Sequence, residues 1–185
     1  MISVSDPTRY LADAEVGLAP LAELFDTLVA RDVEAVLPHD VPPPFDRLLV
    51  HEDHMTVRLA EYHGNSVELS VLNTKREGDA YAREILLTVP GSDKPVEIGV
   101  VRIDLTQLEA GPRDEILAKD RPLGEILIRH NVLRRVEPRW FYKLPVSLRA
   151  HHKLDAAPHE PVYGRVGVIH CNEKPAIELL EIVRA

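Results

Sequence analysis

The segment that decides the fold is VYGRVGVIHCNEKPAIELLEIV, which runs from Val162 to Val183. Along residues 176–183 successive side chains fall into two alternating sets, and a period of two is typical of a β-strand with one face in a protein core. The β-rich run 162–170 precedes it, and Asn172-Glu-Lys-Pro175 between the two has the composition of a turn. The segment therefore predicts a β-hairpin.

One side of the second strand carries an acidic residue among apolar ones. This set is Ile177, Leu179, Glu181 and Val183. The carboxylate of Glu181 is therefore predicted to point into the interior. Another predicted strand, 81–87, carries a basic residue on an otherwise apolar side. Its set is Tyr81, Arg83, Ile85 and Leu87.

A buried charge destabilises a protein by several kcal/mol unless another group pairs with it. Two inward charges of opposite sign, Arg83 and Glu181, therefore have two interpretations. They form either one structural ion pair or the polar ends of a ligand cavity. Alternation of side chains leaves both interpretations open.

The remaining strands lie close together in the sequence. Residues 67–71, 80–88, 95–105 and 136–144 are the further β-rich runs, and Pro90-Gly-Ser-Asp-Lys94 joins two of them as a hairpin turn. Such closely spaced strands favour an α+β fold with a mostly antiparallel sheet flanked by helices.

Helical patterns surround these strands. Residues 1–17 have no clear period and are interpreted as a loosely specified lead-in. A first helix is predicted from Leu18 to about Asp32, with Leu21, Leu24, Phe25, Leu28 and Val29 on one face. A second is predicted between Asp53 and Gly64, and two short ones open at Gly111-Pro112 and at Pro122. The proline- and histidine-rich stretch 145–161 is predicted to be a loop.

Length and composition limit the class of protein. The 185 residues suffice for one domain, predicted to span 1–185, and are too few for two ordinary ones. A net charge of −8 argues against a basic nucleic-acid-binding face. The one cysteine, Cys171, cannot form an internal disulfide, and we find neither a secretory signal nor a membrane-spanning stretch. These observations predict a cytoplasmic location, with no membrane partner.

Histidines occur in two groups, His51 with His54 and His151 with His152 and His159. Neither group shows the carboxylate–histidine pattern that would complete a metal site. We therefore expect no metal and no cofactor, and interpret these histidines as structural or solvated. Cys171 has no activating base near it in the sequence and is interpreted as a free thiol.

Four segments, in order, resemble chorismate pyruvate-lyase. They are Glu52-Asp-His-Met-Thr-Val-Arg58, Ala82-Arg-Glu-Ile-Leu-Leu87, Pro122-Leu-Gly-Glu-Ile-Leu127, and Lys174-Pro175 followed by Glu181. The resemblance covers residues 52 to 181. It implies a highly twisted, mostly antiparallel sheet flanked by helices, with an enclosed ligand cavity. The ligand-binding positions of that family correspond here to Met55, Arg83, Leu123 and Glu181.

The resemblance also implies an activity. Members of the family convert chorismate to 4-hydroxybenzoate and pyruvate without a cofactor. Arg83 would then anchor a substrate carboxylate through its planar fork, and Glu181 would act as general acid/base or hydrogen-bonding group, so these two are the predicted catalytic residues. Met55 and Leu123 would form apolar walls. After Gly99 the sequence reads Val-Val-Arg-Ile, where the family has an arginine directly, and Arg102 is the candidate that could compensate.

This departure from the family leaves open a divergent enzyme that makes 3-hydroxybenzoate or acts on another chorismate-like acid. Two other functions remain as alternatives. The same fold serves as the effector-sensing domain of some bacterial transcription regulators, so the chain could be a non-catalytic module that binds or senses an aromatic acid. The segment before the fold is too short and acidic to be a winged-helix DNA-binding domain. The third interpretation is a structural protein with an Arg83–Glu181 ion pair. The sequence does not decide the oligomeric state.

Overall fold

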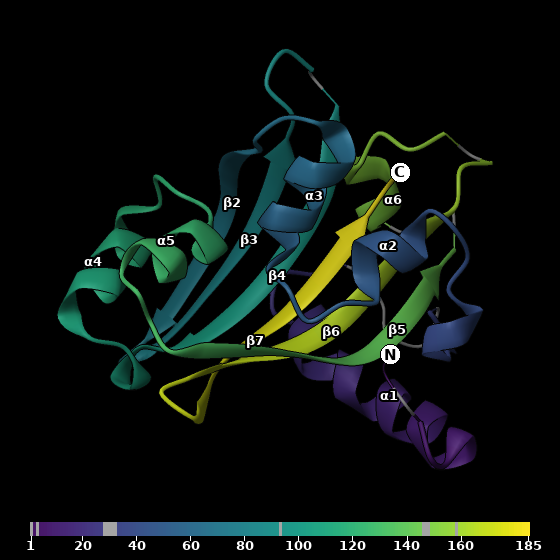
Figure 1. Cartoon of the computed structure of the whole chain (residues 1–185), viewed down its shortest axis with the longest axis horizontal. Helices are drawn as coiled ribbons and strands as arrows, with labels where there is room; N and C mark the ends of the chain where they lie inside the picture. Colours follow the sequence, from purple (N-terminus) through teal and green to yellow (C-terminus); the bar gives the residue numbers. More distant parts are fainter. Residues whose placement is uncertain (1, 3, 28–32, 93, 146–148, 158) are drawn as a thin grey trace.

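A single antiparallel sheet organises the chain (Figure 1). The computed structural model describes residues 2, 4–27, 33–92, 94–145, 149–157 and 159–185. The strands are β1 (Glu34–Val36), β2 (Glu68–Glu77), β3 (Ala80–Thr88), β4 (Pro95–Asp104), β5 (Arg134–Leu144), β6 (Val162–Cys171) and β7 (Lys174–Val183). Their order across the sheet is β1-β5-β6-β7-β4-β3-β2, with every neighbouring pair antiparallel.

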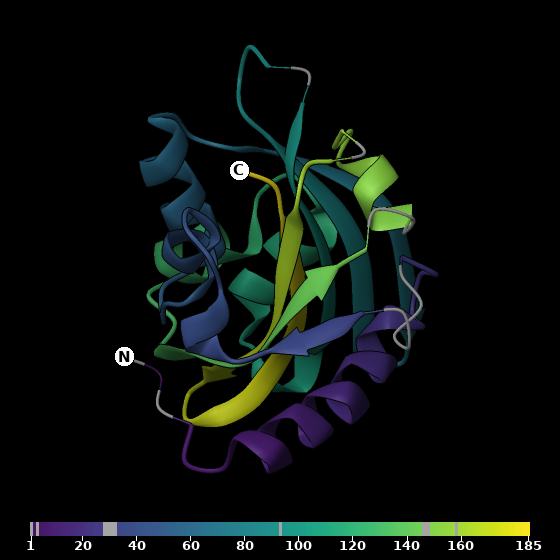
Figure 2. The same ribbon diagram turned by 90° about the vertical axis from the view of Figure 1, so that its right-hand side faces the viewer.

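Helices pack on both faces of this sheet (Figure 2). The α-helices are α1 (Pro7–Ala22), α2 (Phe45–Leu49), α3 (Met55–His63), α4 (Ala110–Ala118), α5 (Leu123–Arg129) and α6 (Arg149–Lys153), and the short 3-10 helices are η2 (Pro38–Asp40) and η3 (Leu105–Gln107). Apolar side chains of α1 and α6 form one core with one face of the sheet. Those of α2 to α5 form two further cores on the opposite face. The predicted α+β class, with helices flanking an antiparallel sheet, is confirmed.

The hairpin predicted over residues 162–183 is the pair β6–β7, and β7 also pairs with β4. Within β7 the side chains of Leu179 and Glu181 point to the face covered by α2 to α5, because both line a pocket there. Leu180 and Ile182 belong to the core beneath α1. The alternation that was read from the sequence is thus present in the structure.

The N-terminal prediction is wrong. Residues 7–17, interpreted as a lead-in, form most of α1, and the helix ends at Ala22 instead of near Asp32. Asp6 caps the helix by accepting a hydrogen bond from the amide of Arg9, and residues 23–26 form turns. Leu28 and Val29 of the predicted helical face lie outside the described residues.

Two short helices were also not predicted. Helix α2 follows the proline-rich connection at residues 38–45, and α6 lies within the stretch 145–161 that was predicted to be a loop. The α3 boundary was predicted correctly at its end, where Gly64 adopts φ 65°. Among the described residues, no helix is long and apolar enough to cross a lipid bilayer.

Helix α1 approaches the sheet at Gly17, which packs against the ring of Trp140. A Cβ atom at Gly17 would overlap with that ring. Gly17→Ala is therefore expected to destabilise the protein by about 1–2 kcal/mol, because overpacking outweighs the roughly 1 kcal/mol that alanine contributes to helix propensity.

Urea denaturation measures this effect, and Val16→Ala is the matched control because Val16 lies on the exposed side of α1. A Gly17→Ala variant more stable than the wild type would contradict the close approach of α1 to Trp140.

Candidate ligand-binding site

A pocket lies between the sheet and the first turns of α3 and α5. Measured as the space open to the centre of a water molecule, its volume is about 50 Å³. The four ligand-binding positions predicted from the sequence all line it: Met55, Arg83, Leu123 and Glu181. Eleven further residues complete the lining: His54, Thr56, Leu69, Ile85, Leu87, Glu97, Val101, Pro122, Gly124, Ile169 and Leu179. The structure therefore brings residues far apart in the sequence together around one space.

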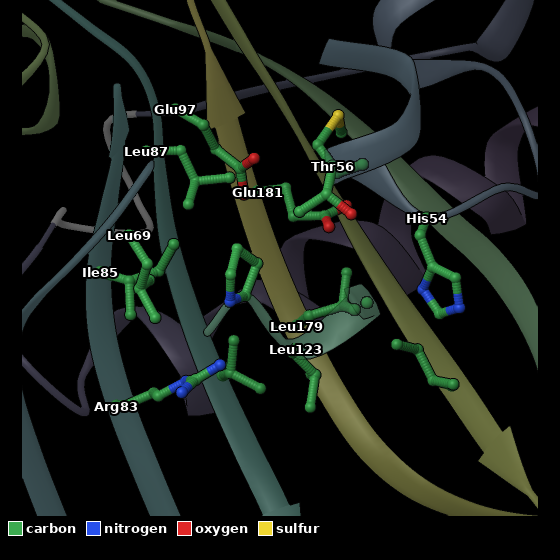
Figure 3. A pocket seen from close by; sticks show the side chains of 15 residues that line it. His54, Thr56, Leu69, Arg83, Ile85, Leu87, Glu97, Leu123, Leu179 and Glu181 are labelled. Atoms are coloured by element: carbon green, nitrogen blue, oxygen red, sulfur yellow. The ribbon is translucent and has the colours of Figure 1, made fainter. Parts of the chain in front are cut away.

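Arg83 is a buried arginine, and two of its three guanidinium nitrogen atoms have no hydrogen-bond partner among the described residues. Its side chain projects from β3 into the pocket (Figure 3), and the residue is 1 % exposed. Atoms Nε and Nη1 donate to no acceptor among the described residues. Burial lowers the pKa of the guanidinium, and the neighbouring Tyr81 raises it. A guanidinium stays charged at neutral pH, so Arg83 is a buried cation for which no hydrogen bond to a carboxylate is found among the described residues.

Glu181 is paired with Arg165 and not with Arg83. Nε of Arg165 donates to Oε2 of Glu181 at 2.6 Å. The two residues face each other across strands β6 and β7. This ion pair rules out the structural interpretation in which Glu181 neutralises Arg83.

The guanidinium of Arg165 also holds the segment that leads into α3. Its Nη1 atom donates to the carbonyl oxygens of Leu49 and His51, each at 2.9 Å. Its Nη2 atom donates to the carbonyl of Asp53 at 3.4 Å. Arg165 thereby ties the connection between α2 and α3 to the centre of the sheet.

Glu97 brings a second carboxyl group to the same pocket. The residue lies on β4, is 3 % exposed, and has an Oε2 atom without a hydrogen-bond partner among the described residues. Burial, reinforced by repulsion from Glu181, raises the pKa of Glu97 well above its usual range, and Arg165 opposes the shift. Glu97 is therefore protonated under conditions in which an exposed glutamate would be ionised.

Two histidines next to the pocket remain neutral. Burial lowers the pKa of His51 to about 3, and Arg165 contributes to the shift. Burial and Arg134 lower the pKa of His54 to about 4. Nε2 of His54 accepts a hydrogen bond from Nε of Arg134 at 2.7 Å. Among the residues with described positions, no group of three or more His, Cys, Asp or Glu side chains is arranged to hold a metal ion.

These shifts predict how stability depends on pH. Below pH 6.5 the unfolded chain binds protons at His51 and His54, whereas the native state does not until about pH 3–4, so acidification destabilises the protein. Glu97 has the opposite sign, because its native carboxyl keeps a proton that the unfolded chain loses above about pH 4.5. Two histidines outweigh one glutamate, so the free energy of unfolding is expected to fall from pH 6.5 to 4.5, by about 2 kcal/mol.

Urea denaturation across this pH range checks the prediction. His54→Gln keeps an acceptor for Arg134 but cannot titrate, so its pH profile is expected to be shallower, by up to about 1.4 kcal/mol per pH unit. Parallel profiles for the wild type and this variant would contradict a neutral, buried His54.

Other sequence interpretations are corrected. Arg102, considered as a compensating arginine, does not reach the pocket. It forms a half-exposed ion pair with Glu178 on the opposite face of the sheet. Arg165 and Glu97 were missed, although both lie in strands that the sequence predicted. Arg165 could have been found, because a short turn in the 162–183 hairpin places it opposite Glu181.

Comparisons with known proteins identify the fold. No protein-family model and no curated protein matches the chain. Among solved structures, PhnF from Mycobacterium smegmatis has 15% identity and a TM-score of 0.56, with 92% of this chain and 80% of that chain covered. The effector domain of PhnF has 14% identity and a TM-score of 0.51, with 72% and 89% covered. The shared fold is chorismate lyase-like.

The prediction that the chain is a chorismate lyase is corrected by these findings. The two solved structures named above are a full-length PhnF and its effector domain, and at 14–15% identity they share the fold alone, so the resemblance does not carry the enzyme's activity. The pocket volume of about 50 Å³ is well below the roughly 300–1,000 Å³ of typical small-molecule sites, so in this arrangement the pocket is too small for chorismate or for any other ring-sized acid.

Proposed function

We propose that this chain is a non-catalytic module that binds a small organic acid, with Arg83 as the anchor of the ligand's carboxylate. Aromatic acids such as 4-hydroxybenzoate are the first class to test, because apolar side chains line the pocket around Arg83. The fold shared with the effector domain of PhnF is compatible with this function.

The observation that carries the proposal is the unpartnered guanidinium of Arg83. A charge withdrawn from water destabilises a protein unless hydrogen-bonded partners surround it. Arg83 has two nitrogen atoms without such partners among the described residues, and it faces a cavity. The N–H groups of Nε and Nη1 point to different sides of the guanidinium, so one carboxylate would bind Nη2 together with either Nε or Nη1, through two parallel hydrogen bonds.

The pocket has to widen for a ring-sized ligand. Its walls belong partly to the short first turns of α3 and α5, which meet where Gly124 packs against Thr56 and His54. A small shift of these turns enlarges the space while the sheet, which carries Arg83, stays in place. Binding is therefore proposed to select or induce a more open arrangement of α3 and α5.

Isothermal titration calorimetry with 4-hydroxybenzoate and benzoate tests the proposal. The wild type is expected to bind at least one of these acids. Arg83→Met is expected to weaken that binding by roughly 10- to 100-fold, since a charge-assisted hydrogen bond contributes about 1.5–3 kcal/mol.

The matched control is Arg102→Met, which removes an arginine from the opposite face of the sheet and should leave the affinity unchanged. Equal affinity of the wild type and Arg83→Met for the bound acid would exclude Arg83 as the anchor. Absence of binding of every acid to the wild type would reject the proposed function itself.

A further inference from the structure

The pocket has two chemically different ends. Figure 3 shows the guanidinium of Arg83 on one side and the carboxyl groups of Glu97 and Glu181 on the other. The electrostatic neighbours agree, because Glu181 acts on the pKa of Glu97 whereas neither carboxyl group contributes to the shift at Arg83. Apolar side chains such as Leu179 and Ile85 line the space between the two ends.

Strand register gives the spacing between these ends. Arg83 pairs with Val101, and Glu97 pairs with Leu87, so the two charged residues are four positions apart along the β3–β4 pair. At roughly 3.3 Å per residue, this corresponds to about 13 Å between backbone positions. Both side chains line the same pocket, so the two ends are separated by a span that a small molecule with one ring or a short chain could bridge.

The acidic end of the pocket, formed by Glu97 and Glu181, has a carboxyl oxygen that accepts no hydrogen bond. Oε2 of Glu97 has no partner among the described residues. The ion pair with Arg165 engages Oε2 of Glu181, and Oε1 is not part of it. In the empty pocket Glu97 is protonated and Arg165 balances Glu181, but once Glu97 ionises this end carries two negative charges against the single charge of Arg165. A ligand group that donates several hydrogen bonds would supply donors to these oxygen atoms. If it also carries one positive charge, it would balance the ionised carboxylate of Glu97.

We propose that the ligand is an amino acid in the broad chemical sense, with its carboxylate on Arg83 and a protonated amine between Glu97 and Glu181. An ammonium group has three donors and one charge, whereas a hydroxyl group has one donor and no charge. This inference rests on the proposed function, because it assumes that Arg83 binds the carboxylate. It assigns to Glu97 the role of recognising the amine, at the end of the ligand opposite the carboxylate.

Binding of such a ligand is coupled to a proton. Glu97 is protonated in the empty pocket, and a bound ammonium group favours the ionised carboxylate of Glu97. The carboxyl proton therefore leaves to solvent, while the ammonium group keeps its three protons. The other titratable groups that line the pocket or lie directly behind it are Arg83, Glu181, Arg165, His54 and His51. The two histidines are neutral already, the two guanidinium groups keep their charge, and Glu181 is already paired with Arg165, so Glu97 is the group that changes its charge.

Calorimetry with two probes that differ by one ammonium group tests the inference. At pH 7 the wild type is expected to bind 4-(aminomethyl)benzoate at least roughly tenfold more tightly than 4-methylbenzoate. Repeating the titration in buffers of different ionisation enthalpy should reveal release of up to one proton for the amine and none for the methyl compound. In Glu97→Gln, whose folding is checked by thermal unfolding, the affinity ratio should fall to near one.

The outcomes separate the two proposals. If neither compound nor 4-hydroxybenzoate binds the wild type, the proposed function fails. If the wild type binds 4-methylbenzoate as tightly as the amine, and Arg83→Met weakens that binding, the carboxylate anchor stands and the amine site is rejected. An unchanged affinity ratio in folded Glu97→Gln also rejects it.

Discussion

Arg165→Met is expected to lower the free energy of unfolding by about 3–5 kcal/mol. Methionine fills much of the volume of arginine but leaves the carboxylate of Glu181 buried without a cation. The carbonyl oxygens of Leu49 and His51 also lose the donor that Arg165 supplies. Urea denaturation measures the loss directly, and the corresponding fall in melting temperature is roughly 6–20 °C for a chain of this size.

The matched control is Arg102→Met. Its partner is Glu178, and the two side chains are 42% and 43% exposed, so this variant is expected to lose no more than about 1 kcal/mol. The double variant Arg165→Met/Glu181→Leu should regain part of the loss, because no uncompensated charge remains. Equal effects of Arg165→Met and Arg102→Met would contradict a buried, stabilising ion pair.

Arg83→Met is expected to have the opposite effect and to raise the stability of the unliganded protein, by about 1–3 kcal/mol. Arg83 is buried, and two of its nitrogen atoms lack partners among the described residues. Replacing an unpartnered buried charge with an apolar side chain of similar length removes the desolvation penalty and retains the packing of the stem.

Thermal and urea unfolding without ligand check this second prediction, with Arg83→Lys as the control that keeps a charge and should show no such gain. Adding an acid that the wild type binds should stabilise the wild type and leave Arg83→Met unaffected. A loss of more than about 1 kcal/mol in unliganded Arg83→Met would show that the guanidinium has a structural role. The two results together decide whether Arg83 is retained at the expense of stability.

Much of the sheet could be predicted from the sequence, because strand alternation is a local signal. It placed Arg83 and Glu181 on the face that forms the pocket. It could not show which charges meet, since that depends on strand order. Strand β4 lies between β3 and β7, so Arg83 and Glu181 are not neighbours, and Glu181 finds Arg165 across the β6–β7 hairpin instead.

The helices were harder to predict for identifiable reasons. Gly17 and Pro20 interrupt the helical signal of α1, although Asp6 followed by Pro7 is a typical helix start. Glycine is needed at position 17 for contact with Trp140, a distant residue of β5. Helices α2 and α6 have five residues each, too few for a clear period. The activity was misjudged because motifs of a fold were read as motifs of an enzyme.

The position of β7 has a consequence for synthesis of the protein on the ribosome. Among the strands described, β7 emerges last, yet it occupies the middle of the sheet and joins β6 to β4 (Figure 1). Until it emerges, the β2–β3–β4 and β1–β5–β6 groups are two separate units whose facing edges are open to other chains. The nascent protein is therefore most exposed to aggregation in the interval before β7 emerges and completes the sheet. Glu181 reaches the pocket only in that final step.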